Sequence, residues 1–222
     1  MTAQAMSNQA GAVPVESPTF ERFGGLCAIL AGVAGFAYAV AFIIPRSDGL
    51  SALCLLLVGL FTTAALPAAY RRLRETDAGF ALWALLLGVA GALGSAVHGG
   101  YDLANAINSP AAANADLPNQ VDPRGLLTFG VAGVALFTVA WLIGRGRGAQ
   151  FPLGLGYLGY AAAALLVILY LGRLIILDAK SLAIVVPALL SGFLVNPAWY
   201  VWLGLELWRG RGYSSRVLSA ES

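Results

Sequence analysis

The segment HGGYDLANAIN, residues 98–108, holds the densest group of side chains that could do chemistry. His98, Asp102 and Asn105 are spaced by four and three residues, so a helix would place them on one face, with Tyr101 at its border. A histidine beside a carboxylate could exchange a proton or hold a polar ligand. The alternative is a polar helix end whose groups satisfy one another, and such structural arrangements are the commoner case.

Two further polar residues stand in apolar surroundings. Arg173, in YLGRLIILDAK, is expected near the depth of Asp102, where it would pair with that carboxylate or reach the lipid headgroups. Asn196 precedes Pro197 near the middle of the last apolar stretch, where proline should kink the helix and Asn could cap the restarted half. Broken helices form binding sites in transporters, although packed kinks are more frequent. The candidate ligand-binding set is His98, Tyr101, Asp102, Asn105, Arg173 and Asn196.

No motif of a catalytic or metal site accompanies these residues. The chain has no G-x-S-x-G, no P-loop, no HExxH and no CxxC, and its one histidine excludes a bis-histidine haem. We therefore expect no catalytic residue, no metal and no cofactor. Cys27 and Cys54 should lie at different depths as free thiols. Glu206 is expected to pair with Arg209, three residues on.

Apolar helices must position these groups. Of 222 residues, 59% are apolar and 11% charged, and the charges leave six uncharged stretches of 20 to 25 residues. A helix needs about 20 apolar residues to cross a bilayer, so we predict an all-α, polytopic membrane protein with six transmembrane helices in one bundle. Soluble, disulfide-stapled and disordered classes are excluded. The expected spans are about 24–44, 49–69, 80–99, 125–144, 153–177 and 182–208, within a membrane domain 23–208 between flexible cytoplasmic tails 1–22 and 209–222.

Positive charges predict the orientation of these spans. Three lysine or arginine residues would lie on one side of the membrane and nine on the other. The nine are Arg22, Arg71, Arg72, Arg74, Arg145, Arg147, Arg209, Arg211 and Arg216. Such residues stay cytoplasmic during insertion, so we expect both termini in the cytoplasm and a multi-pass protein of the cell inner (plasma) membrane. Trp83, Trp141 and Trp208 fall at the same expected interface, in agreement. A net charge of +2 indicates no nucleic-acid partner.

Glycine and alanine should hold the helices together. Small residues four apart, such as Ala28 and Gly32 or Gly88 and Ala92, let helix backbones approach closely in a bilayer. Because every span has this trait, we interpret the stripes as seams within one bundle rather than as a homodimer interface. The connection SPAAANADLPNQVDPRG is the only long one and could fold over the His98 face as a lid.

Three segments together resemble a known group of proteins. The opening FERFGGLCAILAGVAGFAYAVAFI, the segment HGGYDLAN and the closing NPAWYVWLGLELWR are similar to small uncharacterised six-span integral membrane proteins of bacteria. The resemblance implies a bacterial inner-membrane protein and supplies no catalytic residue.

Three functions are compatible with this pattern. The first is a non-enzymatic protein that binds or passes a small molecule through an outer-facing polar cluster near His98, Tyr101, Asp102 and Arg173. The second is a structural or accessory subunit of a membrane complex, with a membrane-protein partner. The third, a lipid-modifying enzyme, would need acid and base groups at headgroup depth, which His98 and Asp102 could supply without an accompanying nucleophile. Membrane lipids are expected partners in each case.

Overall fold

The computed structural model describes residues 18–108, 124–176, 178 and 180–210, which fold into helices with no strand among them. The expected lid connection and most of both expected tails lie outside the described residues. The helices are α2 (Pro18–Ile43), α3 (Asp48–Leu73), α4 (Ala78–Ile107), η1 (Leu126–Val131), α5 (Ala132–Arg145), α6 (Leu153–Ile175), α7 (Leu182–Leu189), η2 (Leu190–Val195) and α8 (Asn196–Arg209).

Because η1 continues into α5, and α7 continues through η2 into α8, these elements form six continuous helical segments, which we call rods. All six are long and apolar enough to cross a membrane. This confirms the predicted all-α bundle of six helices. Two ends differ from the expectation. Residues 18–22 belong to the start of α2 rather than to a tail. Proline is tolerated at the start of a helix, because the N–H that it lacks would have no partner there, and the negative charge of Glu21 is favourable near a helix N-terminus. α4 also continues past Gly99 to Ile107.

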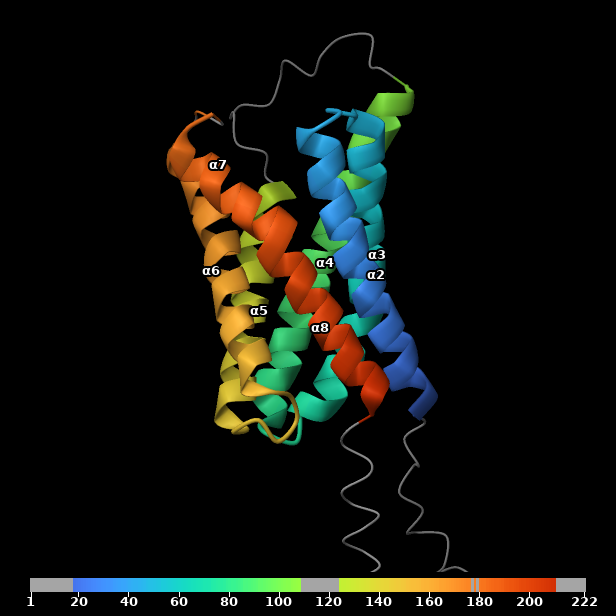
Figure 1. Ribbon diagram of the computed structural model, residues 1–222, viewed down its shortest axis with the longest axis vertical. Coiled ribbons are helices and arrows are strands. Elements are labelled where there is room, and N and C mark those ends of the chain that lie inside the picture. The colour runs from blue at the N-terminus through green and yellow to red at the C-terminus, as the bar shows by residue number, and fades with distance from the viewer. Residues whose placement is uncertain (1–17, 109–123, 177, 179, 211–222) are drawn as a thin grey trace, which may run out of the picture.

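The rods alternate in direction, so residues 18 and 210 lie at the same end of the bundle (Figure 1). We call this the arginine-rich end, because it carries Arg22, Arg71, Arg72, Arg74, Arg145, Arg147 and Arg209. The opposite end carries Arg46, Arg124 and Lys180. The last rod crosses the others diagonally: α7 packs on α6 at the opposite end, and α8 packs on α2 at the arginine-rich end (Figure 1).

Small residues bring the helix backbones into contact, as the sequence predicted. A Cβ added to Gly32 of α2 would lie 2.9 Å from the Pro197 carbonyl oxygen of α8. A Cβ on Gly59 of α3 would lie 2.5 Å from both the Ala92 oxygen and the Ala96 nitrogen of α4. Real Cβ atoms do not approach backbone so closely, so these contacts require glycine. The bundle is held by close backbone packing.

A buried arginine joins three helices at the arginine-rich end. The Arg72 side chain of α3 is 5% exposed, and its Nη2 donates to Glu21 Oε2 of α2 at 2.9 Å. Its Nη1 donates to the Glu206 carbonyl oxygen at 3.1 Å, and Nη2 lies 3.3 Å from the Leu207 carbonyl oxygen. Both carbonyls belong to the last turn of α8, where a helix provides no N–H group to bind them. The guanidinium therefore neutralises Glu21 and caps α8 together.

Two local predictions near α8 can be checked. Glu206 Oε1 lies 3.5 Å from Arg209 Nη1, which confirms the expected ion pair. The break before Pro197 takes the form of the π-helical turn η2, and Asn196 does not cap the backbone. Its Nδ2 instead donates to the Ser191 hydroxyl at 2.6 Å. Proline has no N–H for the preceding turn, so a wider turn at that place accommodates the missing donor.

The two cysteines are free and buried, as expected.

A candidate site in the polar cleft at the end of α4

Asp102 is the centre of a polar cluster at the end opposite the arginines. Its Oδ1 accepts a hydrogen bond from Arg124 Nη1 at 3.0 Å, and its Oδ2 lies 3.4 Å from His98 Nε2, one turn earlier on α4. Arg124 Nη1 also lies 3.4 Å from the His98 carbonyl oxygen. This geometry exists because α4 remains helical through Gly99 and Gly100. The carboxylate joins α4 to the start of the fourth span.

Thr128 and Tyr101 complete the surroundings of this pair. The Thr128 hydroxyl donates to the Arg124 carbonyl oxygen at 3.0 Å and lies 3.5 Å from His98 Nδ1. Each ring nitrogen of His98 therefore lies near an oxygen that can accept a hydrogen bond from an N–H group. The Arg124 guanidinium also stacks over the Tyr101 ring, 4.6 Å from its centroid, which is a cation–π contact.

A cleft of about 470 Å³ opens beside Asp102, between the ends of α2, α3 and α4. Tyr38 and Phe42 of α2 form one wall, and their rings stack with centroids 5.8 Å apart and an interplanar angle of 21°. The opposite walls carry Asp48 and Ser51 of α3, and Asp102 and Asn105 of α4. Its described lining includes two carboxylates and no lysine, arginine or histidine.

Close helix packing closes the inner side of the cleft. Ala52 and Leu55 of α3 line its depth. Immediately beyond them, a Cβ on Gly99 would collide with the backbone of α3 at Leu56 and Ala52. Further in, Gly59 packs directly on the backbone of α4. The structure therefore shows a cleft with a floor between α3 and α4.

The predicted site residues divide into two groups. The structure brings His98, Asp102 and Asn105 to one face of α4, with Tyr101 beside Arg124, and places Asp102 and Asn105 in the cleft. Arg173 and Asn196 lie elsewhere.

The predicted pairing of Arg173 with Asp102 is wrong. Asp102 binds Arg124 instead, while Arg173 Nη1 is buried without a hydrogen-bond partner among the described residues. Depth alone suggested the pair, but α4 packs mainly against α3, η1 and α5, and α6 lies beyond α5. Arg124 stands just before η1, which packs directly against α4, and therefore lies close enough to pair with the carboxylate.

Asn196 does not belong to the cleft. Its Nδ2 is used by Ser191, its Oδ1 is buried without a partner in the described part of the chain, and neither residue lines the cleft.

Sequence reasoning missed several residues of the cleft and, in Arg124, the partner of Asp102. Tyr38 and Phe42 are spaced by four, which places an aromatic pair on one helix face, but in the sequence they are part of an apolar span. Asp48 and Arg124 were counted only as charges bounding the spans. Their positions next to apolar stretches could have indicated polar groups at the membrane surface.

The fold and the polar ends define the class of this chain: it is a multi-pass membrane protein. Comparison with protein-family models, with curated proteins and with solved structures finds no match. Among the described residues, no three His, Cys, Asp or Glu side chains gather closely enough to hold a metal ion.

Proposed function

We propose that this protein binds a small organic cation in the cleft between α2, α3 and α4. The observation that carries the proposal is the lining of the cleft: it combines two carboxylates with a stacked pair of aromatic rings and has no basic side chain among its described residues. An ammonium group is attracted by both kinds of wall, since carboxylates pair with it and ring faces stabilise it by about 0.5–2 kcal/mol.

Asp48 is the carboxylate best placed to receive the cation. Asp102 already shares its two oxygens between Arg124 and His98. Asp48 makes no ion pair among the described residues, and it stands at the exposed N-terminus of α3. An incoming cation would pair with Asp48 without displacing Arg124, while Asn105 and Ser51 offer further hydrogen bonds.

Binding, rather than passage, is the activity that this conformation supports. The contacts of Gly99 and Gly59 leave no room for a ligand to move inward between α3 and α4. The cleft lining also does not extend to Asn196 in the middle of the last rod.

The cleft would face the outside of the cell. The arginine-rich end gathers seven described arginines, and positive side chains are retained on the cytoplasmic side during insertion. A plasma membrane, with both chain ends in the cytoplasm, is therefore part of the proposal, in keeping with the resemblance to bacterial inner-membrane proteins.

Thermal unfolding in the presence of tetramethylammonium chloride tests this function. Binding to the folded state raises the melting temperature, so the protein should become more stable than in sodium chloride of equal ionic strength. The rise should disappear in Asp48→Asn and persist in Asp178→Asn, an exposed acid at the same end of the bundle. Equal melting temperatures in the two salts, or an equal rise in Asp48→Asn, would reject the cation site.

The second candidate is a structural or accessory subunit, and it is supported by the two arginine centres. Arg124 ties η1 to α4, and Arg72 ties α2, α3 and α8, so both act as links between helices. In this case tetramethylammonium leaves the melting temperature unchanged, and removal of either arginine lowers it.

A further inference from the structure

A second hollow lies at the arginine-rich end, between the end of α5 and the start of α6. It is a groove of about 210 Å³ with small residues along it: Ala140 and Gly144 from α5, and Gly156 from α6. A Cβ on Gly144 would meet nothing within 4 Å, so the groove is open there. Leu153 is exposed beside it and adds an apolar wall.

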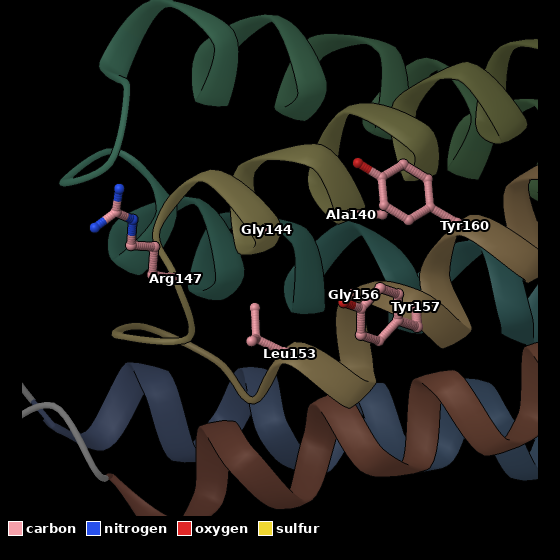
Figure 2. A pocket seen from close by; sticks show the side chains of 7 residues that line it. All are labelled: Ala140, Gly144, Arg147, Leu153, Gly156, Tyr157 and Tyr160. Atoms are coloured by element: carbon pink, nitrogen blue, oxygen red, sulfur yellow. The ribbon is translucent and has the colours of Figure 1, made fainter.

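An arginine and two phenols are the polar side chains of this groove. In Figure 2, Arg147 stands at one end of the groove and Tyr157 and Tyr160 lie toward the other, with Gly144 and Leu153 between them and the phenol hydroxyls directed toward the Arg147 end. Tyr157 is 71% exposed, although it belongs to a membrane-spanning helix. Tyrosine with its ring in an apolar layer and its hydroxyl toward water is typical of the membrane interface.

The one charged residue among the described residues that line the groove is positive. Arg147 is exposed and forms no ion pair within the described part of the chain. No acidic residue lines the groove.

We propose that the groove holds one anionic phospholipid. The headgroup phosphate would bind Arg147, and one acyl chain would lie past Gly144 and Leu153 toward Tyr157. A phospholipid supplies both parts in the right order, an anion at interface depth and an apolar chain beside the glycines. The membrane that surrounds the six rods provides it. Guanidinium–phosphate pairs are among the stronger polar contacts, and this one is complementary in charge.

The chain offers a matched pair of variants for the test. Arg147 has φ 51°, in the left-handed region, and the exposed Arg46 at the opposite end also has φ 51°. Asparagine tolerates this conformation, so Arg147→Asn and Arg46→Asn remove the same charge at the same backbone geometry. Gly144→Leu fills the groove from an open position and should leave the fold intact.

The measurement is lipid retention by native mass spectrometry, after release from nanodiscs of equal parts dioleoylphosphatidylglycerol and dioleoylphosphatidylcholine. Both leaflets then have the same composition, so the two ends of the bundle meet the same lipids. The wild-type protein and Arg46→Asn should retain one phosphatidylglycerol in preference to phosphatidylcholine. Arg147→Asn should retain it about tenfold more weakly, the loss expected for one charge-assisted hydrogen bond. Gly144→Leu should retain less of it than the wild type.

Three results would overturn the site. They are no preference for phosphatidylglycerol in the wild type, equal retention by Arg147→Asn and Arg46→Asn, or full retention by Gly144→Leu. Melting temperatures measured for every variant show that the folded protein is being compared.

Discussion

Asp102 is held from two directions, by Arg124 from the fourth span and by His98 from its own helix. Its side chain is 40% exposed, so water screens part of the attraction. Such pairs contribute modestly to stability, on the order of 0.5 kcal/mol. The larger consequence is geometric, because the pair fixes one wall of the cleft relative to η1.

A double-mutant cycle measures this pair. Asp102→Asn and Arg124→Gln should each lower the free energy of unfolding, and the double variant should lose about 0.5–1 kcal/mol less than the sum of both. Arg173→Gln is the control: combined with Asp102→Asn its effect should be additive, since the two side chains do not pair. Coupling to Arg173 in place of Arg124 would show that the cluster is wrongly assembled. Reversible unfolding in mixed detergent micelles gives these energies.

Arg72 should matter far more for stability than its exposed neighbours. Arg72→Met leaves Glu21 and the last carbonyls of α8 without their donor, which should cost about 3 kcal/mol, as for other buried ion pairs that lose one partner. Arg22→Met removes an exposed charge at the same end and should change the free energy of unfolding by less than about 0.5 kcal/mol. Equal losses in the two variants would contradict the role of Arg72.

The sequence could predict which polar residues share the face of α4, because helical spacing alone decides it. It could not predict their partners. The choice between Arg124 and Arg173 depends on which helix lies next to α4, and apolar stretches of similar length and composition carry little information about their order around a bundle. Tyr38 and Asp48 were missed for the same reason, since they come together only when α2, α3 and α4 pack.

Among the elements, the seam between α3 and α4 forms the floor of the cleft and brings the two helix backbones into direct contact. Gly59→Ala would place a methyl group 2.5 Å from backbone atoms of α4 and force the helices apart, with an expected loss of about 1–3 kcal/mol.

Gly35→Ala is the matched control for this seam. The nearest atom to its new Cβ would be Val58 Cγ2 at 3.8 Å, an ordinary contact, so stability should stay the same or rise slightly. Thermal unfolding of both variants checks the prediction. A tolerated Gly59→Ala would mean that α3 and α4 are not in backbone contact.

The last rod shows how far sequence can describe an element. Pro197 predicted an interruption of the helix, and the structure has one in the turn before it. The path of this rod, from α6 to α2, was not predictable, because its direction is set by the neighbours against which Ile184 and Gly204 pack. The seam that Gly204 forms with Gly25 and Ile29 holds α8 against α2.

For the whole molecule, composition was the most informative property. Six uncharged stretches bounded by charged residues leave few alternatives to a bundle of membrane-crossing rods, and the described chain forms that bundle. The continuation of α4 to Ile107 was harder to foresee, because Gly99 and Gly100 suggest a helix end. Packing of Gly99 against α3 gives this glycine a structural reason to stay helical.

The account rests on the cleft opening to the outside, away from the arginine-rich end. Cysteine labelling in intact cells tests this most directly, in a Cys27→Ala, Cys54→Ala background. Asn108→Cys is exposed at the cleft end, and Ala149→Cys is exposed at the arginine-rich end. A membrane-impermeant maleimide should label the cysteine at 108 in intact cells and the one at 149 only after the cells are permeabilised. Labelling of 149 in intact cells, with 108 protected, would contradict the account.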